Sequence, residues 1–201
     1  MIPKDLKEFL HAFNEHGVKY LVVGGYAFGA HAEPRATKDL GVFIATGIPN
    51  SNAVYQALAA YGAPLDGFTP ADFRDDSGFQ IGQPPARVGI LQKISGITFD
   101  EAWANRVEGL IDGEVLAPVI SKGDLIRNKL EAGRDQDLLD VKILRSLSGD
   151  ETGPTKCSGG LFPAPFSLFE PPLTPRFPLP KLSGINRAHT LVYSICDTSS
   201  L

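Results

Sequence analysis

A short apolar run that ends in a pair of glycines constrains the fold of this chain more than any other feature. The run covers residues 19–23, and Gly24 and Gly25 follow it directly. Its length and apolar character predict a buried strand. A glycine pair then lets the backbone turn tightly and approach a ligand closely. Residues 26–31 suit one or two helical turns, and residues 40–44 form a second apolar run. The sequence therefore predicts a strand, a tight turn, a short helix and a second strand.

The rest of the first 150 residues alternates helical and strand patterns. Apolar residues at the spacing i, i+3, i+4, i+7 predict an amphipathic helix that Gly17 can terminate: Leu6, Phe9, Leu10 and Phe13. Thr98 and Glu101 have the spacing of a capping box. Other elements are predicted as helices at about 52–61, from 98 through 103, from 121 to about 132 and at about 135–147, a strand at 87–91, and a hairpin turn at Asp112-Gly113 between two β-prone segments. The expected class is α+β, a mixed sheet flanked by helices, with C-terminal helices.

The composition changes near residue 150. Residues 1–150 contain 15 Lys and Arg, 20 Asp and Glu and 8 prolines, whereas residues 151–201 contain 4, 3 and 8 of these. The stretch 161–182 has neither helical nor strand periodicity, and its prolines favour extended conformations. We therefore divide the chain into a domain at 1–150 and a Pro-rich, poorly ordered tail at 151–201. A Pro-rich ligand for a partner protein is the alternative interpretation of the tail.

Charge and composition exclude several classes of protein. The net charge is −4 and the pI is near 5.5, so no global basic field indicates a nucleic-acid or membrane partner. No apolar run approaches the roughly 20 residues that span a bilayer, and no apolar segment follows the charged start as in a secretory signal. Two cysteines make neither a disulfide framework nor a zinc site, and the four histidines lack metal-ligand spacing. We expect a cytoplasmic protein.

The glycine pair belongs to a longer motif. Thirteen residues separate Gly25 from Asp39, and the last four of them are Arg35-Ala36-Thr37-Lys38. Val23 and Gly24 stand directly before Gly25. This pattern resembles the active-site signature of the nucleotidyltransferase superfamily, and it is similar to small prokaryotic members such as abortive-infection type IV toxin nucleotidyltransferases. Residues 87–99 resemble the third active-site strand and the helix after it. The segment with Ser121, Lys122, Leu125, Ile126, Lys129, Arg134, Asp137 and Asp140 resembles the C-terminal helical part of the family. The resemblance covers about residues 5–148.

The resemblance implies a Mg²⁺-dependent transfer of a nucleoside monophosphate from a nucleoside triphosphate to a hydroxyl group. In the family, two carboxylates at i and i+2 of one strand and a third on a neighbouring strand hold the metal. Side chains at i and i+2 of a strand share a face, which suits this role. Asp39 matches the first carboxylate, but Gly41 and Gly89 stand where the second and third are expected. Glycine offers no side-chain oxygen, so we expect a defective metal site.

Other residues are candidates for nucleotide binding by the same resemblance: Gly24, Gly25, Arg35, Thr37, Lys38, Lys129 and Arg134. Arg35 and Lys38 are equally expected as solvated ion-pair partners, and Lys129 as a surface lysine. Asp137 and Asp140 share a helix face, so they are expected to order Arg134 or Lys129 rather than to bind metal.

Three functions remain open from the sequence. The first is a transferase that acts on a hydroxyl of RNA, a protein or a small molecule, and that Gly41 and Gly89 impair. The second is a pseudoenzyme that binds a nucleotide or a partner without turnover, including an antitoxin in a toxin–antitoxin system. The third is an inactivated version of an intact enzyme, with which a frameshifted or read-through end at 151–201 would agree. None of the three calls for a membrane.

Overall fold

The protein is described by a computed structural model that covers residues 3–34, 37, 39–83, 86–111 and 113–147, together with the backbone of a strand at 185–188. Its helices are α1 (Lys4–Glu15), α2 (Gly24–His31), α3 (Ile48–Tyr61), α4 (Phe99–Ala104), α5 (Lys122–Ala132) and α6 (Asp135–Ser146), with a 3₁₀ helix η1 (Pro70–Arg74). Its strands are β1 (Tyr20–Val23), β2 (Asp39–Ile44), β3 (Gly78–Ile81), β4 (Arg87–Leu91), β5 (Val107–Ile111), β6 (Val115–Val119) and β7 (Ile185–Ala188). Within these described residues, no helix has the length and apolar character to cross a membrane.

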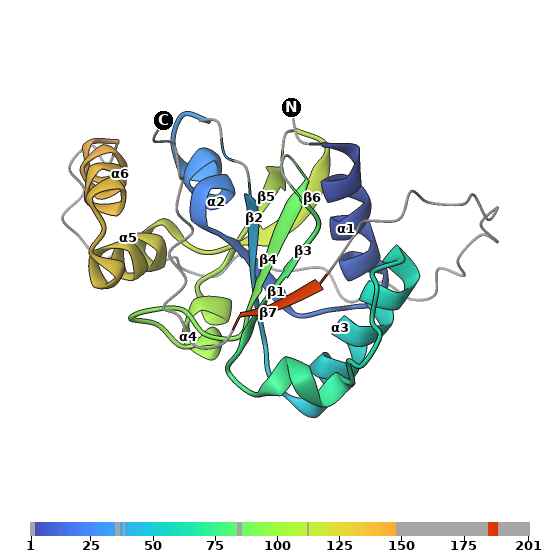
Figure 1. The fold of residues 1–201 in the computed structure, drawn as a ribbon. Coiled ribbons are helices and arrows are strands. Elements are labelled where there is room, and N and C mark those ends of the chain that lie inside the picture. Colours follow the sequence, from blue (N-terminus) through green and yellow to red (C-terminus); the bar gives the residue numbers. More distant parts are fainter. Residues whose placement is uncertain are drawn as a thin grey trace, which may run out of the picture.

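The strands form one mixed sheet in the order β5-β6-β1-β2-β4-β3-β7. β2 is antiparallel to β1 and parallel to β4, while β1 is parallel to β6. Helices α1 and α3 lie on one side of the sheet, and α2, α4, α5 and α6 lie on the other (Figure 1). The predicted α+β class, with a mixed sheet flanked by helices, is therefore confirmed.

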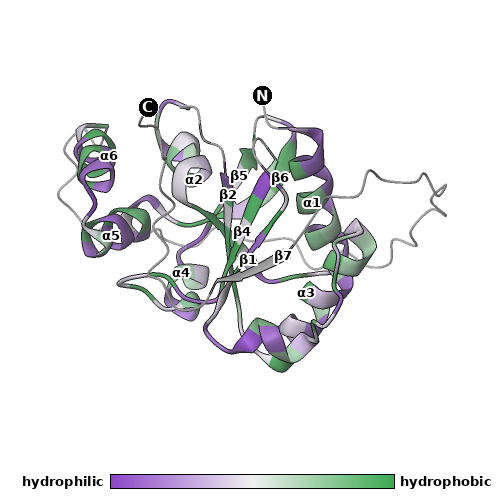
Figure 2. Cartoon of the chain, in the orientation of Figure 1, coloured by the Kyte–Doolittle hydropathy of each residue, from purple (hydrophilic) through white to green (hydrophobic). Residues whose placement is uncertain are grey.

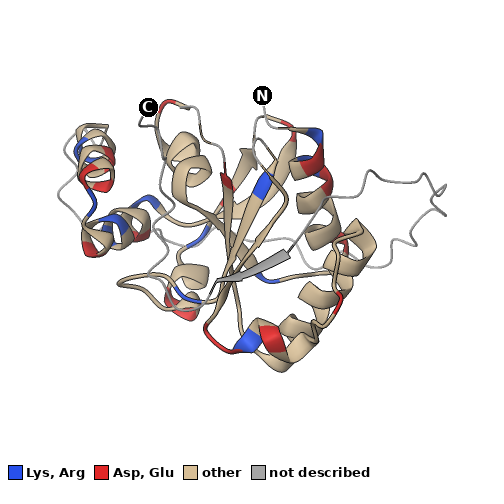
Figure 3. Ribbon diagram, viewed as in Figure 1, with Lys and Arg blue, Asp and Glu red and all other residues tan. Residues whose placement is uncertain are grey.

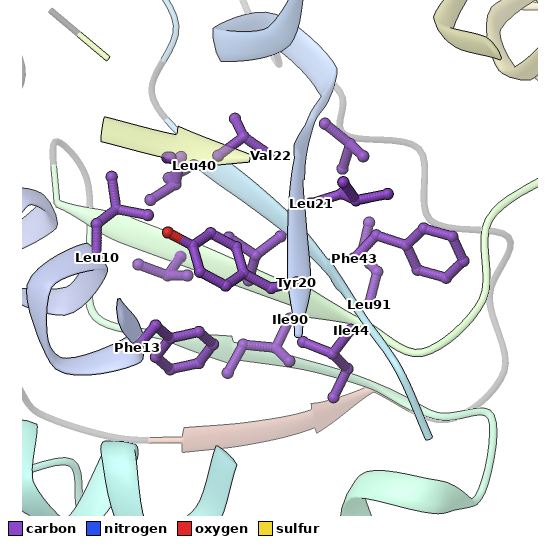
Figure 4. Close-up of a cluster of buried hydrophobic side chains, with 14 of the residues drawn as sticks. Leu10, Phe13, Tyr20, Leu21, Val22, Leu40, Phe43, Ile44, Ile90 and Leu91 are labelled. Carbon is purple, nitrogen blue, oxygen red and sulfur yellow. The ribbon is translucent and has the colours of Figure 1, made fainter. Parts of the chain in front are cut away.

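The core fills both sides of the central strands. On the α1 side, Phe13 packs edge-on against Tyr20 with ring centroids 5.5 Å apart. On the opposite side, Phe43 of β2 packs edge-on against Phe99 of α4 at 5.2 Å. The close-up shows Leu10, Phe13 and Tyr20 on one side of the strands, and Phe43 and Leu91 on the other (Figure 4). The strict alternation of strand side chains between two faces produces these two layers.

Hydropathy and charge distinguish the central strands from the outer helices and loops (Figures 2 and 3). The central strands are largely hydrophobic, and hydrophilic residues gather on the outer helices and connecting segments (Figure 2). Most Asp, Glu, Lys and Arg residues likewise lie on helices and loops (Figure 3). Two charged side chains that do lie at the start of central strands, Asp39 on β2 and Arg87 on β4, therefore stand out as candidates for a function.

Several sequence predictions are confirmed at the level of elements. The helix caps at Thr98 and Ser121 are present, and both side chains accept a hydrogen bond from the third residue of their helix. β5 and β6 form the expected antiparallel hairpin, in which Gly113 adopts a positive φ of 73°. Asp112, the other turn residue of that prediction, lies outside the described residues.

Two predictions differ from the structure. Helix α3 starts at Ile48 rather than near residue 52, because Gly47 is its N-cap and Pro49 fits in the first turn, where its missing N–H is not needed. The composition of the tail predicts no regular structure, yet residues 185–188 form β7, which pairs antiparallel with β3. The rest of the tail lies outside the described residues, so the division of the chain at residue 150 remains a prediction.

One buried side chain fixes the ends of the central strands relative to α3. Asn50 is buried, and its Oδ1 accepts a hydrogen bond from the backbone N–H of Lys19 at 2.7 Å. Its Nδ2 donates to the carbonyl oxygens of Lys19 and Ala45, at 3.0 and 2.8 Å. Asn50 thus satisfies backbone groups just before β1 and just after β2, which holds these two strands in a fixed relation to α3.

Candidate functional site

The end of β1 and the starts of β2 and β4 meet at one edge of the sheet. Val23 pairs with Gly41, and Asp39 pairs with Arg87 in the parallel ladder. Gly24 and Gly25 follow β1 directly as the first residues of α2. The sequence prediction that residues 40–44 and 87–91 form neighbouring strands is confirmed. We call the group of Gly24, Gly25, Thr37, Asp39, Gly41, Arg87 and Gly89 the Asp39 site.

Gly41 and Gly89 are direct neighbours across this ladder. They pair with each other, and the register continues without interruption from Asp39–Arg87 to Phe43–Leu91. Neither glycine therefore marks a β-bulge, which is the alternative interpretation of a glycine in a strand. Neither has a positive φ among the described glycines, so the backbone does not require glycine there. No heavy atom lies within 4 Å of a Cβ added at Gly89, so the space for a side chain exists at this position.

The carboxylate of Asp39 is fully engaged by Arg87. Arg87 donates from Nε to Oδ1 at 2.6 Å and from Nη2 to Oδ2 at 2.5 Å, a bidentate ion pair. The Asp39 side chain is only 11% exposed, whereas the Arg87 side chain retains 28% exposure. The hydrogen bonds from Arg87 to Asp39 raise the pKa of the Arg87 guanidinium above its ordinary value. The Asp39 site therefore presents a fixed pair of opposite charges with the cation on the outer side.

This donor set does not fit a resident Mg²⁺ ion. Magnesium takes oxygen ligands in octahedral geometry and relies on carboxylates for charge. Here one carboxylate is present, and a guanidinium already occupies both of its oxygens. In the part of the chain that the structure describes, no group of three His, Cys, Asp or Glu residues gathers to hold a metal. We therefore derive no chemical step through a metal ion at this site.

The glycine pair and Thr37 pack closely against each other. Gly24 has a φ of 69°, a conformation that favours glycine. A Cβ added at Gly25 would lie 2.7 Å from the Thr37 hydroxyl oxygen, so Gly25 permits an approach that alanine would block. The Thr37 hydroxyl donates to the carbonyl oxygen of Asp39 at 3.4 Å. Thr37 therefore connects the α2 start to the β2 start. Arg35 and Lys38, the other candidates in this segment, lie outside the described residues.

Lys129 and Arg134 belong to a separate ion-pair cluster between α5 and α6. The Lys129 ammonium lies 2.8 Å from Asp137 Oδ1 and 2.7 Å from Asp140 Oδ2, and all three residues are buried. Arg134 Nε lies 2.9 Å from Asp137 Oδ2. The prediction that Asp137 and Asp140 order these cations is confirmed, and Lys129 is not a surface lysine. This Lys129 cluster belongs to the two C-terminal helices, whereas Asp39 belongs to the β2–β4 ladder.

A large hollow lies at the opposite edge of the sheet, and sequence reasoning missed it. This cleft of about 900 Å³ opens where β2 and β4 end. Its lining includes Phe43, Asn50, Ile97, Phe99, Trp103 and Arg127, from five different segments of the chain. The sequence offered no signal for it, because its lining comes from segments far apart in the chain that only the fold brings together. We call it the α3–α4 cleft.

Comparisons with known proteins add a likeness to solved structures. No protein-family model matches the chain, and no curated protein matches it in sequence. Among solved structures, the chain is similar to the crystal structure of the lincosamide antibiotic adenylyltransferase LnuA with lincomycin bound. The TM-score is 0.47 and the sequence identity is 15%, over 73% of this chain and 99% of that chain.

Proposed function

We propose that this chain is a nucleotidyltransferase-type protein in which metal-dependent transfer is impaired. The proposal rests on the motif resemblance, in which a strand, a Gly-Gly turn, a short helix and an acidic strand follow in order. The described elements agree with that order: β1 ends at Val23, α2 begins at Gly24, and β2 begins at Asp39 next to the parallel β4. The family reaction would transfer a nucleoside monophosphate from a nucleoside triphosphate to a hydroxyl acceptor.

The observation that carries the impairment is that glycines occupy positions 41 and 89, in the middle of the Asp39 site. Gly41 and Gly89 face each other in register beside the Asp39–Arg87 ion pair. Loss of a single well-placed electrostatic group at an active site typically lowers the rate about 10²–10³-fold. Here two direct metal ligands of the family pattern are missing and the third is paired. We therefore expect negligible transfer and weak or no Mg²⁺ binding by the chain as written.

The remaining groups favour an anion over a cation. The first turn of α2 begins directly at Gly24, so its backbone N–H groups can contact a phosphate. The guanidinium of Arg87 is the more exposed member of its ion pair and can add a hydrogen bond to a phosphate oxygen. Thr37, Arg35 and Lys38 remain candidate contributors. We assign Lys129 and Arg134 to holding α5 against α6, since buried or neighbouring carboxylates already engage them.

A paired calorimetric and transfer experiment tests this function. ATP and CTP are titrated into the chain with and without MgCl₂, and transfer of labelled nucleotide is measured for a Gly41→Asp, Gly89→Asp double variant. A Gly41→Asn, Gly89→Asn variant is the matched control, because it adds the same side-chain volume without charge. We expect nucleotide binding by the chain that changes little with Mg²⁺, and metal-dependent transfer by the Asp variant alone. Robust transfer by the chain as written would contradict the proposal.

The second candidate function is a non-catalytic binding protein. The ion pair between Asp39 and Arg87 favours it, because Arg87 binds both oxygens of the one carboxylate that remains in the pattern. In this case the Asp39 site binds a nucleotide or a partner without turnover, and an antitoxin is one candidate partner. An Asp variant that folds but gains no transfer would support this function over the first. RNA or protein as the acceptor stays a prediction that depends on the first function.

A further inference from the structure

The α3–α4 cleft lies at the other end of β2 from Asp39, where residues of α3 and of α4, from the two sides of the sheet, line it together (Figure 1). Phe43 lines it, and Phe43 is four residues after Asp39 on this strand. At about 3.3 Å per residue, the two positions are roughly 13 Å apart along the strand. The cleft shares no lining residue with the Asp39 site. It is therefore a separate feature, and a ligand bound there is independent of the proposed nucleotide role.

The walls of the cleft are fixed by bonds between different elements. Asn50 joins the start of α3 to the backbone before β1 and after β2. On the other wall, Asn128 Nδ2 of α5 donates to the carbonyl oxygen of Ser95 at 2.9 Å. In the same loop, Gly96 has a φ of 77°, and a Cβ added there would lie 3.0 Å from Glu131 Cβ. The loop thus packs closely on α5, which fixes this wall of the cleft.

Aromatic rings form one side of the cleft. Phe99 is stacked on Trp103, with centroids 5.6 Å apart and an interplanar angle of 19°. The edge-on contact between Phe43 and Phe99 continues this row of rings into the sheet. The Arg106 guanidinium lies 4.0 Å from the Trp103 ring centroid and covers a ring face. These rings give the cleft a continuous aromatic wall, and aromatic rings pack well against another aromatic ring in offset or edge-to-face arrangements.

The charges around the cleft balance. Arg127 Nη1 lies 3.6 Å from Glu101 Oε1, and Lys93 Nζ lies 3.7 Å from Asp76 Oδ2. The remaining charged lining residues are one lysine and one aspartate, Lys19 and Asp100. The lining therefore carries no net charge and selects neither anions nor cations. This distinguishes it from a phosphate or nucleotide site, for which a surplus of positive charge is expected.

We propose that the α3–α4 cleft is a binding site for a small, net-uncharged molecule that carries an aromatic ring. A volume of about 900 Å³ lies within the range of small-molecule sites, roughly 300–1,000 Å³. The aromatic row supplies apolar contact area. The Thr46 hydroxyl, which makes no hydrogen bond with the described residues, and the paired charges of the rim supply polar contacts. A ligand here would sit on α3 and α4, away from Asp39.

Fluorescence tests the proposal directly, because Trp103 is the chain's single tryptophan. The full chain is titrated with N-acetyl-phenylalaninamide, and the emission of Trp103 is followed. The comparison compounds are N-acetyl-leucinamide, which lacks the ring, phenylacetate, which is an anion, and phenethylamine, which is a cation. We expect saturable binding in the millimolar range, strongest for N-acetyl-phenylalaninamide. Equal or stronger binding of phenylacetate or phenethylamine would overturn the net-uncharged assignment, and no saturable binding of any ring compound would overturn the site.

A matched pair of variants on α3 locates the binding. Ala53 is half-buried and lines the cleft, whereas Ala60 is exposed on the same helix and does not. We expect Ala53→Phe to weaken binding at least tenfold and Ala60→Phe to change it less than twofold. Because Ala53→Phe can disturb folding, amide shifts in the unaltered chain give a second measurement. Shifts at Gly47 and Gly96, without shifts at Gly62 and Gly133, support the site. The reverse pattern, or equal binding by both variants, contradicts it.

Discussion

Asp39 and Arg87 start two parallel neighbouring strands, pair directly in register, and are joined by a bidentate ion pair at 2.6 and 2.5 Å. In the nucleotidyltransferase pattern that the sequence resembles, the carboxylate at this position is a metal ligand. In this chain it has a protein cation as its partner, and the family's other two ligand positions carry no side chains. A Mg²⁺ ion held by carboxylates added at positions 41 and 89 would therefore compete with a guanidinium for Asp39.

A double-mutant cycle measures how strongly this pair stabilises the fold. We expect Arg87→Ala to lower the free energy of unfolding by about 1–3 kcal/mol, less than a fully buried pair would lose, because the Arg87 side chain is partly exposed. The double variant Asp39→Ala, Arg87→Ala should lose less than the sum of the single variants, because no charge is left unpaired. Denaturant unfolding measures all four free energies. Strict additivity would mean that the pair contributes nothing.

Removal of Lys129 should cost more stability than removal of any exposed lysine. Lys129→Met leaves Asp137 and Asp140 as buried carboxylates without their shared cation, which typically costs about 3–5 kcal/mol. Lys142→Met is the matched control, because Lys142 is exposed on the same helix as the two carboxylates. Thermal and denaturant unfolding compare the two variants. A loss at Lys129 no larger than at Lys142 would show that the cluster is not structurally important.

The sequence predicted the elements that carry local patterns and missed those that depend on pairing. β1 and β2 were predictable because each is an apolar run. β3 was not, because the alternation of Phe79 and Ile81 with Gly78 and Gln80 is too short to predict a strand, and the pairing with β4 makes it one. The Asp39–Arg87 pair was missed for the same reason, since its two members are 48 residues apart and only the register brings them together.

The glycines offer a contrast that tests the interpretation of the Asp39 site. Gly89 has no positive φ and open space at its Cβ, so Gly89→Ala should raise the free energy of unfolding by about 0.5–1 kcal/mol. Gly82 has a φ of 83°, and an added Cβ would lie 2.4 Å from the Ala86 carbonyl oxygen. Gly82→Ala should therefore lower stability by about 1–3 kcal/mol. Denaturant unfolding gives both values, and a loss at Gly89 would imply a structural need for glycine there.

Deletion of residues 150–201 should have a small effect on the folded domain. It removes β7, whose only described pairing is with the edge of β3, and leaves the buried residues of the domain in place. We expect the thermal midpoint to fall by no more than a few degrees. Scanning calorimetry of the full and shortened chains measures the change. A collapse of stability would show that the C-terminal segment contributes to the core.

Buried tyrosines should make the protein lose stability in alkali. Burial raises the pKa of Tyr20 and of Tyr61 well above the ordinary value, and the Tyr20 hydroxyl donates to Asn14 Oδ1 at 2.8 Å. Both groups stay neutral in the folded state, while in the unfolded chain they ionise near pH 10. The contribution of the two tyrosines to the free energy of unfolding is therefore complete below about pH 10. It is lost as the pH rises towards the folded-state pKa, by up to about 1.4 kcal/mol per pH unit for each group.

Tyr20→Phe should make this decline shallower between about pH 10 and pH 12, although it costs about 1 kcal/mol at pH 7 through the lost hydrogen bond. Denaturant unfolding at a series of pH values compares the two chains, and an unchanged slope for Tyr20→Phe would mean that the Tyr20 phenol already ionises in the folded protein.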